Sequence, residues 1–184
     1  MPSRSLLHWR TDRVPRLAAV EGQCAAPGQP PGLADANLRA VVLLLSAHFQ
    51  GFCRDLHTEC IAALVATVPP AAQSIVQTQC LAGRGLDGAN PRYEIIRDDF
   101  RRFDFDIAPA LGADPANTLR ITHLGHLNSW RNFVAHDKPT PPAVGGPFSL
   151  ATVTGWRASY DGLAVAFDGL LYAHLRKIFG ADPW

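Results

Sequence analysis

The chain has 184 residues, of which 47% are hydrophobic, and its formal net charge is +1. This length suits a single domain, and the apolar fraction is sufficient for a sizeable core. The small net charge argues against a protein whose main work is to coat nucleic acid, while a local basic pocket remains compatible with it. No apolar run approaches the roughly 18 residues of a membrane span, so we expect no membrane partner.

The cysteines indicate a reduced protein. Cys24, Cys53, Cys60 and Cys80 show no paired Cys-x-x-Cys spacing, which argues against a zinc site and against thioredoxin-like chemistry. Cys53 and Cys60 lie seven residues apart on one predicted helix, where they are expected to pack as small hydrophobic side chains. We therefore expect a cytoplasmic location.

Residues 1–32 are predicted to form an N-terminal flank, a partly ordered arm, and residues 33–180 to form a helical domain. Several apolar side chains of the flank could lie against the first long helix, namely Trp9, Val14, Leu17 and Val20. Prolines and glycines over 27–32 then interrupt the chain. The flank is also rich in arginine, which either contacts an RNA backbone or forms a solvated face.

The first long helix is predicted from apolar residues that recur at helical spacing between Leu38 and Leu64. Asp35 is the expected N-cap, and Pro69 stops the pattern. The result is one helix of roughly thirty residues, far above the mean of about 11 to 12.

Two shorter helices and a loop are predicted next. Residues 71–81 are predicted to form a helix, and the glycine-rich stretch 83–91 is predicted to form a loop. It is not a phosphate-binding loop, because neither a preceding strand nor a Gly-Lys-Ser/Thr ending is present. Residues 93–105 predict a helix whose polar face carries both charge signs, and the interleaved arginines argue against a metal site on its carboxylates.

The next helix ends in the most informative stretch of the chain. Its apolar residues recur at helical spacing up to Val134, and prolines from Pro139 onward end it at His136 or just beyond. Arg131 lies at the edge of the apolar stripe, and His136 lies well round the helix from it, so the two side chains cannot simply stack on one face. They either form a phosphate-handling site across a groove, with the last turn loosened or a second copy of the helix completing it, or stabilise the helix end through its dipole and free carbonyls.

The last helix follows a proline-rich loop, with Ser149 or Thr152 as its N-cap and Gly180 as its end. No strand alternation is present, so the fold class is all-α, an up-and-down bundle of four to five helices with two long ones. Phe133, Phe167 and Leu171 fall off the main apolar stripes. A homodimer would bury them.

Two stretches resemble the HEPN family, whose motif is an arginine, four to six residues with a polar one commonly first, and a histidine. One is Leu127-Asn128-Ser129-Trp130-Arg131-Asn132-Phe133-Val134-Ala135-His136-Asp137. The other, over residues 38–56, is similar to the long first helix of bacterial HEPN proteins of toxin-antitoxin and abortive-infection systems. The resemblance covers about residues 33–179. Where the family usually has Glu, this chain has Gln50.

The resemblance implies a metal-independent endoribonuclease that acts as a toxin or defence effector. Arg131 would hold the scissile phosphate, His136 would act as general base or acid, and Asn132 would orient one of them. His48 and Gln50 would be auxiliary to the site. The expected partners are RNA, a second copy of the chain that shares a composite cleft, and an antitoxin or other operon partner; no cofactor is expected.

Two other functions stay open from the sequence. One is a HEPN module without catalysis that binds RNA, a nucleotide or a protein partner, and Gln50 favours it. The other is a helical assembly protein in which Arg131 and His136 are structural.

Histidines outside the motif carry weaker expectations. His123 and His126 have the i,i+3 spacing of a metal-binding pair, but lack an obvious third ligand. His57 and Glu59 are interpreted as residues of a solvated helix face.

Overall fold

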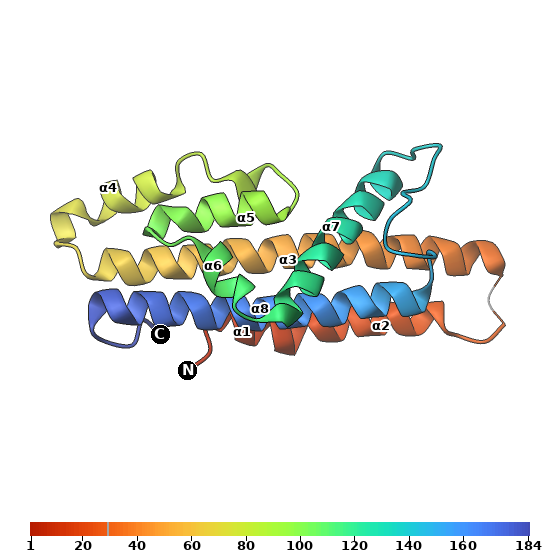
Figure 1. The fold of residues 1–184 in the computed structure, drawn as a ribbon, viewed down its shortest axis with the longest axis horizontal. Coiled ribbons are helices and arrows are strands. Elements are labelled where there is room, and N and C mark those ends of the chain that lie inside the picture. Colours follow the sequence, from red (N-terminus) through yellow and green to blue (C-terminus); the bar gives the residue numbers. More distant parts are fainter. Residues whose placement is uncertain (29) are drawn as a thin grey trace.

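A computed structural model describes residues 1–28 and 30–184 (Figure 1). Its α-helices are α1 (Arg4–His8), α2 (Val14–Cys24), α3 (Pro31–Ala66), α4 (Pro70–Leu81), α5 (Tyr93–Phe100), α6 (Ile107–Gly112), α7 (Pro115–Ala135) and α8 (Leu150–Phe179). A π-helical turn, Trp9–Arg13, joins α1 to α2, and 3-10 turns lie at Gly85–Asp87 and Arg101–Phe103. The described residues contain no strand, which confirms the all-α class, but they form more helices than the four to five expected.

The long helices α3 and α8 run side by side along the molecule and form its frame (Figure 1). The N-terminal helices α1 and α2 lie along α3 and also contact α8, while α4 and α5 lie on the other side of α3. Helix α7 crosses this frame obliquely and contacts both α3 and α8. Figure 1 also shows that α3 and α8 run in the same direction, and Phe49 of α3 accordingly lies against Tyr160 of α8. The up-and-down arrangement expected from the sequence is therefore not observed for the two long helices.

Helix α3 begins four residues before the expected N-cap. Pro30 caps it, and Pro31 takes the first helical position, where a proline loses nothing because that N–H has no helical partner. Asp35 thus lies inside the helix, and its Oδ2 accepts from Arg39 Nε at 2.7 Å. The expectation that Asp35 caps the helix was wrong. The shorter helix expected over 71–81 is present as α4 and begins one residue earlier.

The N-terminal segment is fixed to the frame by Trp9. Its ring is 1% exposed and lies 5.8 Å from Phe49 and 5.7 Å from Phe52, measured between ring centroids. In the π-helical turn that starts at Trp9, the N–H of Val14 donates to the carbonyl of Trp9, five residues back. Pro15 follows directly in the first turn of α2, where a proline is tolerated because its missing N–H is not needed there. The widened turn connects the buried Trp9 to α2.

The side chains that suggested a dimer are covered within one chain. Phe167 and Leu171 are fully buried, and Phe133 is half-buried. Phe167 packs against Phe49 of α3 and Phe100 of α5. The expectation of surplus apolar residues was wrong for Phe167 and Leu171, because several layers of helices surround α8 where the sequence suggested a single bundle. A homodimer therefore needs other support.

His57 and Glu59 do not belong to a solvated face, contrary to expectation. His57 is fully buried, lies against Phe103 and Phe100, and has Nε2 at 3.2 Å from the carbonyl oxygen of Asp99. Glu59 accepts hydrogen bonds from the backbone N–H groups of Arg4 and Ser5 at the start of α1. A periodic pattern on α3 could not reveal that other segments cover these positions.

Burial, and to a lesser degree the nearby Arg84, lowers the pKa of His57 from 6.5 to about 4. Between these two values the unfolded chain binds more protons than the folded protein, so lowering the pH destabilises the fold. We expect His57 to contribute a loss of about 3 kcal/mol in the free energy of unfolding as the pH falls from 6.5 to 4, with none of this loss above pH 6.5. Denaturant titrations of wild type and His57→Gln across this range measure it. Identical pH slopes in the two proteins would contradict the expectation.

Candidate functional site

The end of α7 positions the motif. The helix starts at the N-cap Asp114, whose carboxylate accepts from the N–H of Ala116, and ends at Ala135 with His136 as C-cap. Asp137 follows in the left-handed region at φ 43°, and the N–H of Lys138 donates to the carbonyl of Phe133 at 3.1 Å. This is a Schellman-type helix end. The prediction that the helix ends at His136 is confirmed.

Arg131 is half-buried and has no carboxylate partner among the described residues. Its Nη1 donates only to the side-chain oxygen of the next residue, Asn132, at 3.3 Å. Most other arginines in the described part of the chain form ion pairs, for example Arg84 with Asp87 and Arg157 with Glu21. A guanidinium that is partly desolvated and not neutralised is suited to bind an anion.

His136 is exposed, and its side chain has no hydrogen bond, ion pair or ring contact within residues 1–28 and 30–184. Only its backbone N–H is engaged, by the carbonyl of Asn132 at 3.3 Å. No contact joins the side chains of Arg131 and His136 in this part of the chain. The imidazole is thus accessible to a substrate, and one chain alone does not enclose a phosphate between the two groups.

Asn132 is held by a residue that the sequence analysis did not identify. Asn90 Nδ2 donates to Asn132 Oδ1 at 2.8 Å, and the same oxygen accepts from Arg131. Asn90 ends the glycine-rich loop before α5, and its signal in the sequence is an Asn-Pro pair next to a helix start. The loop therefore fixes the orientation of the motif's amide.

Gln50 acts on the same loop. Its Nε2 donates to the carbonyl of Leu86 at 2.7 Å and to that of Ala89 at 2.9 Å. The amide thus ties α3 to the segment that carries Asn90, and neither of the two bonds involves Arg131. A carboxylate at this position has no hydrogen to donate to two carbonyl groups. The loop that packs here is therefore held by an amide in a way that a glutamate could not reproduce.

We expect Gln50→Glu to lower the free energy of unfolding by about 1 to 3 kcal/mol, because two carbonyl oxygens lose their donor and face a negative charge. Denaturant unfolding at neutral pH measures this. Gln77→Glu on the exposed face of α4 is the matched control and should be nearly neutral. Equal stability of the two variants would contradict a stabilising role for the bonds from Gln50 to the loop.

His48 lies on a different side of α3 from Gln50. Its neighbours are Arg13, Arg16 and Asp12 of the N-terminal segment, and its carbonyl accepts from Arg13 Nη1 at 2.7 Å. Burial, followed by the charge of Arg13, lowers the pKa of the His48 imidazole. The structure therefore does not bring His48 to Arg131.

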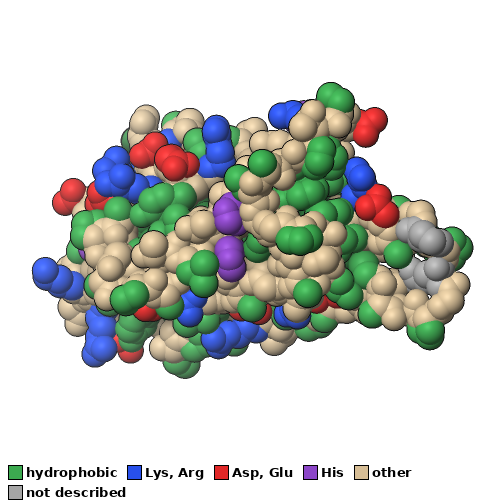
Figure 2. All heavy atoms as spheres, turned by 45° about the vertical axis from the view of Figure 1, so that its right-hand side comes forward, with side chains coloured by type: hydrophobic (Ala, Val, Ile, Leu, Met, Phe, Trp, Pro, Cys, Tyr) green, Lys and Arg blue, Asp and Glu red, His purple; other side chains and the backbone are tan. Residues whose placement is uncertain are grey.

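His123 and His126 are neighbours, with ring centroids 6.0 Å apart. His123 Nδ1 lies 2.7 Å from the hydroxyl of Ser159, and His126 Nδ1 is buried without a hydrogen-bond partner. Within the described residues no third His, Cys, Asp or Glu joins them in a group that could hold a metal. Figure 2 shows a face with two adjoining histidine side chains in a mostly uncharged area and charges of both signs at its edges.

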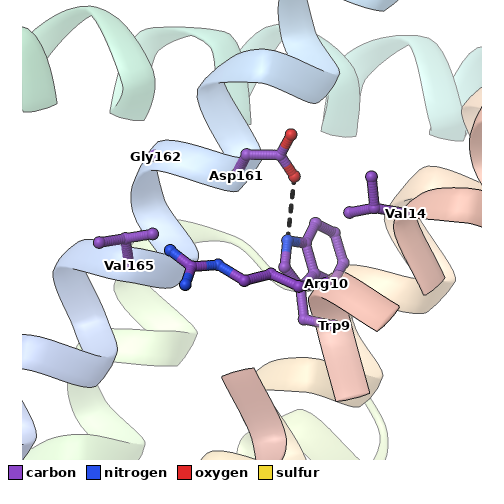
Figure 3. Close-up of a pocket in the computed structure, with 6 residues that line it drawn as sticks. All are labelled: Trp9, Arg10, Val14, Asp161, Gly162 and Val165. Carbon is purple, nitrogen blue, oxygen red and sulfur yellow. Dashed lines mark hydrogen bonds between the residues drawn. The ribbon is translucent and has the colours of Figure 1, made fainter. Parts of the chain in front are cut away.

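One pocket of about 290 Å³ lies between the N-terminal segment and α8 (Figure 3). It is lined by Trp9, Arg10, Val14, Asp161, Gly162 and Val165. The indole N–H of Trp9 donates to Asp161 Oδ1 at 3.0 Å, so this carboxylate serves to hold the buried indole. No predicted site residue lines this pocket.

A second pocket, of about 320 Å³, adjoins the motif. It lies between the start of α5 and the middle of α7, and Asn132 is part of its lining. Arg92, at the N-cap of α5, also lines it and forms no ion pair among the described residues. Nothing in the sequence around Arg92 marks it as a site residue, because only the fold brings it into one pocket with Asn132.

No family model matches the chain, and comparison with curated proteins and with solved structures gives no significant match. No helix among the described residues is long and apolar enough to span a membrane.

Proposed function

We propose that the protein is a metal-independent endoribonuclease in which Arg131 and His136 act on the RNA phosphate. The observation that carries the proposal is the state of these two side chains: Arg131 is half-buried without a carboxylate partner, and His136 is exposed without any side-chain contact in the described residues. A side chain that held the helix end by hydrogen-bonding its last carbonyls would have those carbonyls as partners, and neither side chain does among the described residues. The resemblance of 127–137 to the HEPN motif supports the same function.

The chemistry follows from the two groups. Neutral His136 takes the proton from a ribose 2′-hydroxyl, and the 2′-oxygen attacks the adjacent phosphorus. The guanidinium of Arg131 stabilises the negative charge on the phosphoryl oxygens. The bond to the 5′-oxygen breaks, and a second protonated imidazole or water supplies its proton. The products are a 2′,3′-cyclic phosphate and a free 5′-hydroxyl.

The working form in this proposal is a homodimer. A single chain leaves His136 on an open surface and does not join it to Arg131, so a second copy with its own Arg131 and His136 would complete the cleft. In light scattering at micromolar concentration, the proposal requires about twice the mass of one chain. A mass equal to one chain would contradict it.

The alternative is a binding module without catalysis that uses the same surface. It is favoured by one observation, the absence of any contact between Arg131 and His136 among the described residues. For the nuclease, the biological setting that the resemblance suggests is a cytoplasmic toxin or defence effector, controlled by an antitoxin or another operon partner. The module would instead bind RNA, a nucleotide or a protein partner.

Digestion of single-stranded RNA in excess EDTA separates the two functions. The nuclease cuts under these conditions and leaves 2′,3′-cyclic phosphate ends. The module binds the RNA and leaves it intact, and a binding assay on the same preparation detects this.

A further inference from the structure

The pocket next to Asn132 carries features that the cleavage chemistry does not use. Its lining consists mainly of polar and small side chains of α5 and α7: Arg92, Tyr93, Glu94, Ile121, Gly125, Asn128, Ser129 and Asn132. Its volume of about 320 Å³ lies at the lower end of the range typical of sites for small organic groups. The pocket is therefore suited to a single flat group and too small for a folded partner.

Asn128, one of the lining residues, has an unsatisfied acceptor. The side chain is 5% exposed, and its Nδ2 donates to the carbonyls of Pro91 and Leu124, at 3.2 and 2.9 Å. These two bonds fix which end of the amide is the oxygen. Oδ1 is buried and has no hydrogen-bond partner. Buried acceptors without a donor are uncommon and destabilising, so a ligand that brought an N–H or O–H group to this oxygen would gain a hydrogen bond that the fold leaves unmade.

Arg92 and Tyr93 supply the other elements of recognition. Arg92 is exposed at the pocket and has no ion pair within residues 1–28 and 30–184, and no side chain caps the start of α5 there. The ring of Tyr93 is half-buried in the lining. An aromatic ring, a free guanidinium and an unsatisfied amide oxygen together match a nucleobase joined to a phosphate.

Asn132 connects this pocket to the motif. It lines the pocket, and its Oδ1 accepts from Arg131 at 3.3 Å. A group in the pocket is therefore adjacent to the phosphate that Arg131 would hold. We propose that this pocket binds one unpaired nucleobase of the RNA strand, which presents an N–H group to Asn128 and places the neighbouring linkage at Arg131. The inference rests on the proposed function for its choice of ligand.

The test measures binding separately from cleavage. A single-stranded 2′-O-methyl oligonucleotide cannot be cut by 2′-hydroxyl attack, so its affinity reports binding alone. In a series of such oligonucleotides, each nucleotide in turn is made abasic. We expect one abasic position to weaken binding to the wild-type protein by about tenfold or more, since the loss of one stacked, hydrogen-bonded base has this magnitude.

Two single variants, Arg92→Ala and Ser129→Ala, alter exposed side chains of the pocket. In each variant, the loss of affinity caused by the abasic change at the sensitive position should fall to about twofold or less. Lys177→Ala, at an exposed lysine of α8 remote from the motif in sequence, is the control and should leave the abasic profile unchanged. If the abasic change weakens binding to the wild-type protein equally at every position, the proposal of a base-binding pocket is wrong. The proposed nuclease function is not affected by that result. An RNA that is neither bound nor cut would overturn the proposed function itself.

Discussion

Replacing His136 by alanine is expected to lower the rate of RNA cleavage by about 10²-fold or more while leaving the melting temperature nearly unchanged. The imidazole is exposed and makes no side-chain contact in the described residues, so its removal leaves no buried group without a partner. The backbone bond from the His136 N–H to Asn132 does not depend on the side chain. The measurements are initial cleavage rates and thermal melting on one preparation.

The control for this variant is His8→Ala, which removes another exposed histidine and its contact with Asp12. It should change neither rate nor melting temperature appreciably. If His136 instead serves the helix end, the result reverses: His136→Ala loses about 0.5 to 2 kcal/mol of stability, and cleavage persists.

Replacing Arg131 by lysine should preserve the positive charge and still reduce the cleavage rate by at least about tenfold. A guanidinium donates two parallel hydrogen bonds to a phosphate, and an ammonium group cannot reproduce this geometry. Because Arg131 has no carboxylate partner among the described residues, the change breaks no ion pair in the fold. Rate and unfolding measurements on Arg131→Lys test both statements.

Arg176→Lys is the matched control, since Arg176 lies at an exposed end of α8 and pairs with Asp182. Its rate should equal that of the wild type. A rate for Arg131→Lys equal to that of Arg176→Lys would show that only charge matters at this position.

Elements with strong local signals were predictable from the sequence. The end of α7 at His136 and the end of α8 at Gly180 follow from proline and glycine chemistry, and both are observed. Ser149 caps α8, as one of the two candidates offered. Local rules failed at the start of α3, because the helix begins at Pro31 and Asp35 therefore lies inside it. They also failed at the helix expected over 93–105, which ends at Phe100, with a 3-10 turn and the left-handed Asp104 following.

Contacts between distant segments were not predictable from one sequence. The pattern on α3 could not show that His57 is covered by the end of α5 and the 3-10 turn after it, or that Gln50 faces the loop that carries Asn90. Likewise, the spacing of Arg131 and His136 made them candidates from the sequence, but Arg92 and Asn128 became candidates only when the fold brought them to one pocket. The motif can thus be recognised from local spacing. The residues that surround it come from other segments and depend on the tertiary structure.

The central claim is that the ribose 2′-hydroxyl is the nucleophile and that no metal ion is required. The direct measurement maps one cleaved linkage in a defined RNA and replaces the ribose on its 5′ side by 2′-deoxyribose, with excess EDTA throughout. We predict that cutting is lost at that linkage and retained at the others, with 2′,3′-cyclic phosphate ends at every cut. Undiminished cutting at the 2′-deoxy linkage, or cutting that begins only when Mg²⁺ or Mn²⁺ is added, would contradict the claim.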